Sequence, residues 1–258
     1  MKKYLQILAA TTLLSASANA ASIKQTFKVE IGIFDAAIVD MSYRFENDAY
    51  NFSSQIQTSG LFDTFYSFKA NYLTSGIFAD NSFITQNYEQ HTKSSSHTRT
   101  KRLIFNKNGI LKKRISSKDG VERKVNITLP EKLPDAFDIQ TVLLMLITQF
   151  KQNNSCDLNR TVFNGKKTYH ITIKDQGRIL FKDKKVPLSG EAHKCAAFIH
   201  QGNTEKGDLL WQVSSERFIN FYLMKDKTTE LPYLVKMEIA STPLGKLEAY
   251  MTDLEIKE

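Results

Sequence analysis

Residues 26–33, TFKVEIGI, decide the fold class of this chain. Apolar Phe27, Val29 and Ile31 alternate with polar side chains such as Lys28. A period of two places one set of side chains on a core and the other toward water, which is typical of a half-buried β-strand. The same alternation recurs at residues 39–45, 66–72, 169–173, 233–239 and 247–251. The sequence therefore predicts a mostly β protein.

Two Asn-Gly pairs mark tight turns between such runs. Asn108-Gly109 follows one of them, and Asn164-Gly165 joins residues 161–163 to residues 169–173. Asn-Gly favours the positive φ angles of a hairpin turn, so consecutive strands are expected to pair antiparallel. Residues 61–65 interrupt the alternation and predict one helical turn.

One longer segment, residues 135–150, has helical periodicity. Its apolar residues recur at the spacing of an amphipathic helix: Ile139, Val142, Leu143, Leu146 and Phe150. Asp135, after a proline, is predicted as the N-cap, and Asp138 falls in the first turn, where a carboxylate is favourable. Because the apolar stripe is wide, we expect the helix to pack inside the curve of the sheet. The predicted fold class is one large curved antiparallel sheet, open and barrel-like, with one main α-helix in its concavity.

The first twenty residues, MKKYLQILAATTLLSASANA, have the pattern of a signal peptide. Two lysines precede a short apolar run, and Ala18-Asn19-Ala20 matches a signal-peptidase site. Residues 1–20 are therefore predicted to be removed on export, leaving residues 21–258 as a single β-rich domain in the periplasm of a Gram-negative bacterium. The longest later apolar run, Val142 to Ile147, is too short to span a bilayer, so no transmembrane anchor is expected.

Cys156 and Cys195 are the two cysteines of the chain. Disulfides persist in the compartments that exported proteins reach, and an even number of cysteines favours pairing. We therefore predict a Cys156–Cys195 disulfide, with two separate buried thiols as the alternative. The two cysteines are too far apart for a Cys-x-x-Cys redox motif.

Positive charge is concentrated in residues 93–124. This segment contains eleven Lys or Arg residues and two acidic residues, which gives it a net charge of +9. Such a segment suits anionic lipid headgroups, lipopolysaccharide phosphates or an acidic partner. The alternative, which we favour, is the solvated outer face of strands whose cations discourage edge pairing. Lys112, Lys113 and Arg114, beside the Asn108-Gly109 turn, are the candidate face for an anionic ligand. Nucleic acid is not expected as a partner, because the chain contains no recognisable motif for it.

Several short motifs resemble the bacterial exported proteins grouped as domain of unknown function 3108. They are Phe27-Lys28-Val29-Glu30-Ile31-Gly32, Gly60-Leu61-Phe62 with Phe65-Tyr66, Arg102-Leu103-Ile104-Phe105, Asp135-Ala136-Phe137-Asp138, Leu231-Pro232-Tyr233-Leu234-Val235 and Leu244-Gly245-Lys246-Leu247. The resemblance implies an exported protein with a long curved antiparallel sheet and a helix. That outline is similar to periplasmic lipoprotein carriers, which is a similarity of fold only. No activity carries over from the family.

Catalytic and cofactor motifs are missing from the sequence. It contains no Gly-x-Ser-x-Gly elbow, His-Glu-x-x-His helix, phosphate-binding glycine loop or calcium loop, so we expect no enzyme, no cofactor and no metal site. The best metal candidate is His193 with Cys195 and His200. Alternation along a strand places His200 on the opposite face, which favours a structural role for all three.

Asn159 lies in Asp157-Leu158-Asn159-Arg160-Thr161. This Asn-x-Thr pattern with an acid two residues earlier resembles the extended acceptor of some bacterial oligosaccharyltransferases. Asn159 is therefore a candidate glycosylation site, expected in an exposed connection.

These observations predict a non-catalytic periplasmic binding or carrier module. Its ligand would be an amphiphile, a lipid or a lipidated partner, whose anionic head meets the basic segment. The alternative is an envelope scaffold that binds another protein, and a hydrolase is a distant third.

Overall fold

The computed structural model describes residues 22–122, 136–165, 168–201, 218–242 and 244–257. The predicted signal peptide at residues 1–20 lies outside the described residues, as do Arg123 and Lys124 of the basic segment.

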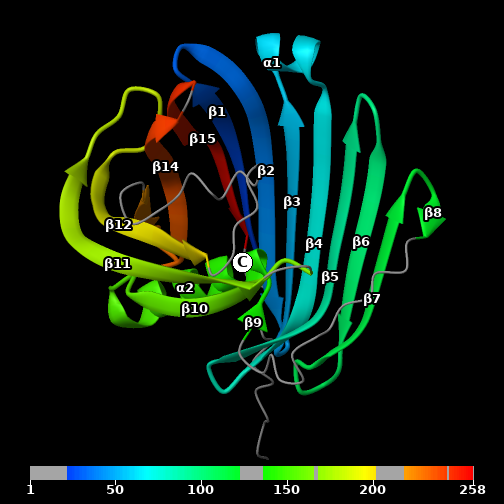
Figure 1. Cartoon of the computed structure of the whole chain (residues 1–258). Coiled ribbons are helices and arrows are strands. Elements are labelled where there is room, and N and C mark those ends of the chain that lie inside the picture. Colours follow the sequence, from blue (N-terminus) through cyan, green and yellow to red (C-terminus); the bar gives the residue numbers. More distant parts are fainter. Residues whose placement is uncertain (1–21, 123–135, 166–167, 202–217, 243, 258) are drawn as a thin grey trace, which may run out of the picture.

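One sheet holds all the described strands (Figure 1). The strands are β1 (Ser22–Ile31), β2 (Phe34–Glu46), β3 (Ala49–Thr58), β4 (Phe68–Ala79), β5 (Ser82–Ser94), β6 (Thr98–Phe105), β7 (Leu111–Lys118), β8 (Val121–Glu122), β9 (Ala136–Phe137), β10 (Leu158–Phe163), β11 (Thr168–Phe181), β12 (Gly190–Gln201), β13 (Ile219–Lys225), β14 (Pro232–Thr242) and β15 (Gly245–Lys257). Their order is β8-β7-β6-β5-β4-β3-β2-β1-β15-β14-β13-β12-β11-β10-β9. The sheet is open, with β8 and β9 at its edges, and all pairs are antiparallel except β9 with β10. The prediction of one large, mostly antiparallel curved sheet is confirmed.

Strand β1 joins the two halves of the sheet. On one side it pairs with β2, the next strand in the sequence, and on the other with β15, the last described strand. The β1–β15 register runs from Ser22 opposite Lys257 to Ile31 opposite Leu247. Residues 26–31 of the TFKVEIGI stretch therefore lie at the centre of the sheet, where Phe27 is buried and Lys28 is on the opposite face, and Gly32 and Ile33 form the turn to β2.

The main helix, α2 (Ile139–Asn153), lies inside the curve of the sheet (Figure 1). Its N-cap is Asp138, whose carboxylate accepts hydrogen bonds from the backbone N–H groups of Gln140 and Thr141. The prediction of Asp135 as the N-cap is wrong, because residues 136–137 form β9 and pair with β10. At the other end, Asn154 adopts a left-handed conformation with φ 52° and stops the helix. The predicted turn at residues 61–65 forms α1 (Gly60–Phe65).

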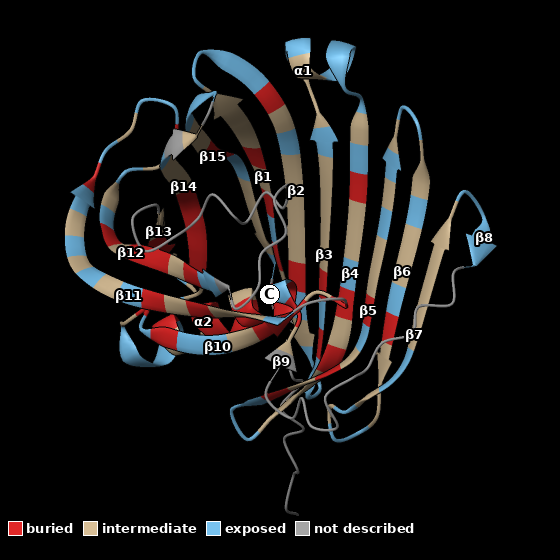
Figure 2. Ribbon diagram, viewed as in Figure 1, coloured by how far each residue is buried: buried red, intermediate tan, exposed pale blue. Residues whose placement is uncertain are grey.

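Buried residues, red on the ribbon in Figure 2, gather in α2 and in the strand segments that face it. Val142, Leu144, Leu146 and Phe150 of α2 are almost fully buried in this main core. A smaller cluster contains Tyr88, Leu103 and Phe163, where β10 lies over β5 and β6. The sheet thus curls until its last strands cover part of its own concave face.

The predicted disulfide between Cys156 and Cys195 is confirmed. The two Cα atoms are 6.3 Å apart, within the usual range, and both side chains are fully buried. The bond ties the segment between α2 and β10 to the middle of β12.

Candidate functional site

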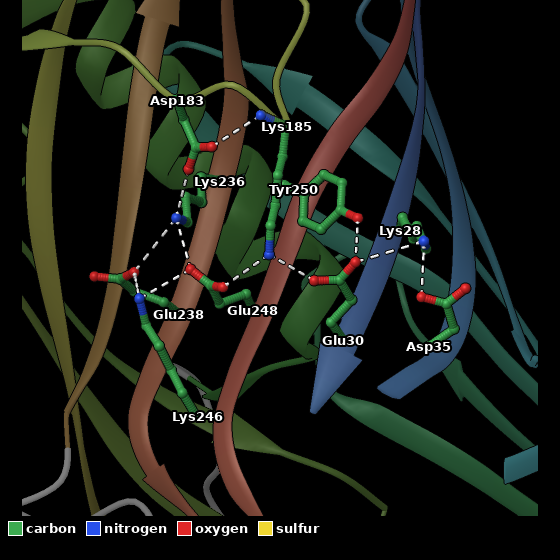
Figure 3. A network of polar contacts seen from close by, with 10 residues as sticks. All are labelled: Lys28, Glu30, Asp35, Asp183, Lys185, Lys236, Glu238, Lys246, Glu248 and Tyr250. Atoms are coloured by element: carbon green, nitrogen blue, oxygen red, sulfur yellow. Dashed lines mark hydrogen bonds and ion pairs between the residues drawn. The ribbon is translucent and has the colours of Figure 1, made fainter. Parts of the chain in front are cut away.

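A network of ion pairs covers the face of the central strands that points away from α2 (Figure 3). We call it the Lys236 network, and its members are Lys28, Glu30, Asp35, Asp183, Lys185, Lys236, Glu238, Lys246, Glu248 and Tyr250. The strand register sets Glu30 of β1 opposite Glu248 of β15, and Glu248 opposite Glu238 of β14. Three carboxylates in one row across three strands would repel one another without cations between them.

Lys236 supplies the central positive charge of this network. Its Nζ atom lies 2.7 Å from Asp183 Oδ2 and 2.7 Å from Glu248 Oε1, and its side chain is only 10% exposed. Lys185 Nζ lies 2.6 Å from Glu30 Oε2 and 3.3 Å from Glu248 Oε2. Because Asp183 and Lys185 belong to the β11–β12 connection, these bonds fasten that connection to the sheet.

The titration of the network follows from its ion pairs. Burial alone would raise the pKa of Glu248, but hydrogen bonds from Lys236 and Lys246 outweigh it and lower this pKa to about 2. Burial also opposes the charged form of Lys236, yet its bonds to Asp183 and Glu248 raise its pKa. Each charge has an opposite partner, so the network stabilises the fold and offers no group poised for proton transfer.

A second polar cluster anchors the start of α2 to the sheet. Asp138 is fully buried and accepts hydrogen bonds from the hydroxyls of Thr74 (2.9 Å), Thr85 (3.2 Å) and Thr141 (2.6 Å). The Tyr50 hydroxyl lies 2.9 Å from Thr141 Oγ1 and donates to Thr85 Oγ1. Burial raises the pKa of Asp138 in spite of these bonds. With no exposed surface, the cluster positions the helix and is closed to a substrate.

Gly76 on β4 makes room for Tyr50. A Cβ atom at this position would lie 2.2 Å from the carbonyl oxygen of Ile84 and 2.7 Å from the Tyr50 hydroxyl. The close packing of β4, β5 and Tyr50 therefore requires glycine here.

Replacing Tyr50 by phenylalanine tests the anchor. We expect Tyr50→Phe to lower the free energy of unfolding by about 1–2 kcal/mol, because it removes the hydroxyl that joins Thr85 to Thr141 in a buried site. Urea denaturation measures the change, and Tyr66→Phe is the matched control because Tyr66 is exposed. Equal stabilities of the two variants would contradict the anchoring role.

Two pockets flank the second half of α2. The first, of about 460 Å³, has an apolar wall and a single cation, and its lining residues are Ile23, Tyr43, Phe45, Phe78, Asn81, Ile147, Thr148, Lys151, Gln152, Leu231 and Pro232. The second, of about 520 Å³, lies on the other side of the helix against β5, β10 and β11, and is lined by Asn81, Ser82, Phe83, Phe137, Met145, Thr148, Gln149, Gln152, Leu158, Asn159, Arg160, Thr161 and His170. Both volumes are in the range of small-molecule sites.

A hydrogen bond from Gln152 Nε2 to Asn81 Oδ1, 2.8 Å long, stands between the two pockets. Both residues, together with Thr148, line both pockets. Exposed Lys151 and Arg160 place one cation beside each pocket. In the first pocket, the apolar wall with a cation at its rim can hold an apolar chain and pair with an anionic head, whereas the lining of the second pocket is mostly polar.

Asn159, the candidate glycosylation site, is exposed but does not lie in a connection as predicted. It belongs to β10, and its Oδ1 atom accepts a hydrogen bond of 3.4 Å from Thr172 Oγ1. Among the described strands, only β9 pairs with the outer side of β10, at Thr161 and Val162, so Asn159 lies at the edge of the described sheet. Glycosylation of Asn159 stays a prediction.

Lys112, Lys113 and Arg114 do not form one face, contrary to the prediction. Arg114 is opposite Leu103 on the concave side, whereas Lys113 is opposite Ile104 on the other side. Lys112 is the extra residue of a bulge. Alternation along a strand separates consecutive residues, so only Arg114 points into the curve.

The metal candidate at His193 is a structural contact. His193 Nδ1 lies 3.2 Å from Asp175 Oδ2, and its ring packs edge-on against Phe150. Cys195 is in the disulfide, and His200 is exposed at the far end of β12. Across the described part of the chain, no three His, Cys, Asp or Glu side chains gather as ligands for a metal ion.

The pockets beside α2 are the candidate site that sequence reasoning missed. Their residues come from β1, β2, β4, β5, β9, α2, β10, β11 and β14 and from the adjoining turns, and no local motif marks them as a site. Neither of the two helices described has the length and hydrophobicity needed to span a bilayer.

Comparison with known proteins identifies a family. A crystal structure of a beta-barrel-like protein of domain of unknown function DUF1849 from Brucella abortus is similar, with a TM-score of 0.48 and 10% identity, over 93% of this chain and 98% of that one. No curated protein sequence matches the chain. The family model described as protein of unknown function (DUF3108) matches residues 26–252, which is nearly the whole described sheet. The chain therefore belongs to the DUF3108 family.

Proposed function

We propose that this protein is a non-catalytic binding or carrier module of the cell envelope, and that its ligand is an amphiphile. The observation that carries the proposal is the pair of pockets on either side of α2, one of them walled by Ile23, Phe45, Phe78 and Ile147. An open pocket of this size with an apolar wall is suited to an apolar chain, which gains free energy by leaving water.

The charges around the pockets support an amphiphile over a purely apolar ligand. Lys151 lines the first pocket, and Arg160 and His170 line the second. A carboxylate or phosphate head at either rim would pair with a cation while its chain occupies the pocket.

The cell envelope fits two features of the chain. Residues 1–20 have the pattern of a signal peptide, and the Cys156–Cys195 disulfide needs an oxidising compartment to persist. The two main polar clusters, by contrast, are committed to structural bonds, which favours binding over catalysis.

Blocking the pockets tests the proposal. Thr148 lines both, so Thr148→Trp is expected to weaken binding of a fluorescent long-chain fatty acid about tenfold or more, a loss of about 1.4 kcal/mol or more of binding free energy. The matched control is Asn153→Trp, at an exposed position of the same helix that lines neither pocket. Fluorescence titration measures both, and native mass spectrometry of the gently purified protein looks for a retained lipid. Equal affinities of the two variants would refute the pocket as the binding site.

An envelope scaffold is the second candidate, and a patch of exposed apolar side chains favours it. Ile33 and Phe34 lie at the β1–β2 turn, Leu244 at the β14–β15 turn, and Leu61 and Phe65 on α1. A hydrogen bond of 2.8 Å from Gly32 N to Lys246 O joins the two turns, and Gly60 packs against the start of β2. Exposed apolar patches of this kind often mark protein interfaces. Chemical cross-linking of this protein to a specific envelope protein tests the scaffold. The scaffold is the better account if Ile33→Ser abolishes that cross-linking and Thr148→Trp, which blocks the pockets, leaves every function intact.

A further inference from the structure

Four basic residues share one face at the β6–β7 end of the sheet. The register sets Arg99 opposite Lys118 and Leu103 opposite Arg114, while Lys101 lies between them on β6. Because paired residues and every second residue along a strand point to the same side, all four side chains belong to one face. We call them the concave basic strip: Arg99, Lys101, Arg114 and Lys118.

This face is the concave one. Leu103 is fully buried in the small cluster with Tyr88 and Phe163, and Phe163 belongs to β10, which lies across the inside of the curve (Figure 1). The turn after β10 packs on the strip itself: Lys101 Nζ donates a hydrogen bond of 2.8 Å to the carbonyl oxygen of Asn164. A Cβ atom on Gly165 would lie 2.8 Å from Lys101 Cδ.

Arg114 is the residue of the strip with buried donor atoms that have no partner among the described residues. Its Nε and Nη1 atoms are buried and have no hydrogen-bond partner. Arg102 and Arg178, by comparison, each form an ion pair with a glutamate: Arg102 with Glu89 at 3.0 Å and Arg178 with Glu191 at 3.1 Å. Burial without a partner lowers the pKa of Arg114. Donor atoms taken out of water need an acceptor to compensate, so the buried Nε and Nη1 atoms of this half-buried side chain suit a ligand that brings one.

The protein itself supplies no carboxylate on this part of the concave face within the described strands β5 to β8. The neighbours of the strip on that face are neutral: Tyr88, Gln90, Thr92, Leu103 and Ser116. Glu89 pairs with Arg102 on the opposite face. Asp138, the buried carboxylate on the concave side, is already bound by the hydroxyls of Thr74, Thr85 and Thr141.

We propose that the concave basic strip binds a phosphate-bearing group and that Arg114 is its principal ligand. A phosphate carries up to two negative charges and several acceptor oxygens, which matches a guanidinium with unpaired donors beside further cations. The strip shares no residue with the pockets beside α2, so it is a second site, independent of the proposed amphiphile pockets.

The experiment titrates the full chain, at low salt, with two probes that separate the possible sources of phosphate. One is inorganic phosphate, followed by isothermal titration calorimetry, and the other is vesicles of phosphatidic acid in phosphatidylcholine, followed by co-sedimentation. We expect saturable binding of at least one probe, and Arg114→Gln is expected to weaken it about tenfold or more. The matched control is Lys113→Gln, which removes the neighbouring charge of the same strand from the opposite face and should leave binding unchanged.

Thermal unfolding separates binding from a structural role for Arg114. Without phosphate, Arg114→Gln should melt at the same temperature as the unmodified chain or higher, because it removes two buried donor atoms that have no partner. A structural role would instead lower the melting temperature. Arg114→Lys, which keeps the charge, should retain part of the binding. Absence of saturable binding to both probes, or equal losses in Arg114→Gln and Lys113→Gln, would overturn the proposal. A failure of the Thr148→Trp test would leave it standing.

Discussion

Removing the disulfide lowers the free energy of unfolding by about 3–4 kcal/mol, the loss expected when a cross-link that closes a loop of this length no longer restricts the unfolded chain. Cys156 and Cys195 are separated by 39 positions in the sequence. We expect the double variant Cys156→Ala/Cys195→Ala to show this loss in urea denaturation. Both side chains are small and buried, so the cavity left by the two sulfur atoms adds only a little to the loss.

The unmodified protein in reducing agent is the control for the disulfide. Reduction should reproduce most of the loss, because it breaks the same cross-link without changing any side chain volume. A double variant as stable as the oxidised protein would show that the bond does not restrict the unfolded chain as expected.

The second large effect concerns Lys236. We expect Lys236→Met to lower the free energy of unfolding by about 3 kcal/mol at pH 7. Removing one member of a largely buried ion pair leaves the partner carboxylates without an opposite charge. Asp183 and Glu248 each lie 2.7 Å from the lysine Nζ atom, and Glu238 faces Glu248 on the neighbouring strand. Lys246→Met is the matched control with a smaller loss, since the Lys246 side chain is 45% exposed.

The pH dependence of this loss has a definite sign. The pKa of Glu248 is lowered to about 2 in the folded protein, from an ordinary value of 4.5. Its contribution to stability is therefore fully present above about pH 4.5 and is lost as the pH falls toward 2. In Lys236→Met, Glu238 and Glu248 lose a neighbouring positive charge and are protonated more easily. The difference in the free energy of unfolding between the variant and the unmodified protein should therefore shrink as the pH falls from about 4.5 toward 2. A difference that stays constant down to pH 3 would contradict this account of the network.

The fold was largely predictable because its main signal is local. Alternation at residues 26–33 and 233–239 identifies half-buried strands without any knowledge of their partners. The N-cap was not predictable in the same way. Asp135 and Asp138 are both plausible caps by residue type, and the choice depends on the pairing of residues 136–137 with β10, a contact that the local pattern does not contain.

The sites depend on contacts between distant parts of the chain. Nothing in the local sequence connects Asp183 with Lys236, and the pockets form only where α2 meets strands from both halves of the sheet. The error at Lys112, Lys113 and Arg114 had a different cause. A high local density of Lys and Arg does not place them on one face, because alternation along a strand separates neighbouring residues onto opposite faces.

The pairing of β1 with β15 also constrains when this protein can fold. Synthesis produces β1 first among the described strands, but one of its two edges pairs with β15, residues 245–257, which is the last of these strands to be made. Until then the centre of the sheet carries an open edge with unpaired backbone groups, the kind of surface that promotes aggregation. The sheet is thus completed late, through contacts between residues far apart in the sequence. Until β15 has been made, the open edge of β1 needs protection against aggregation.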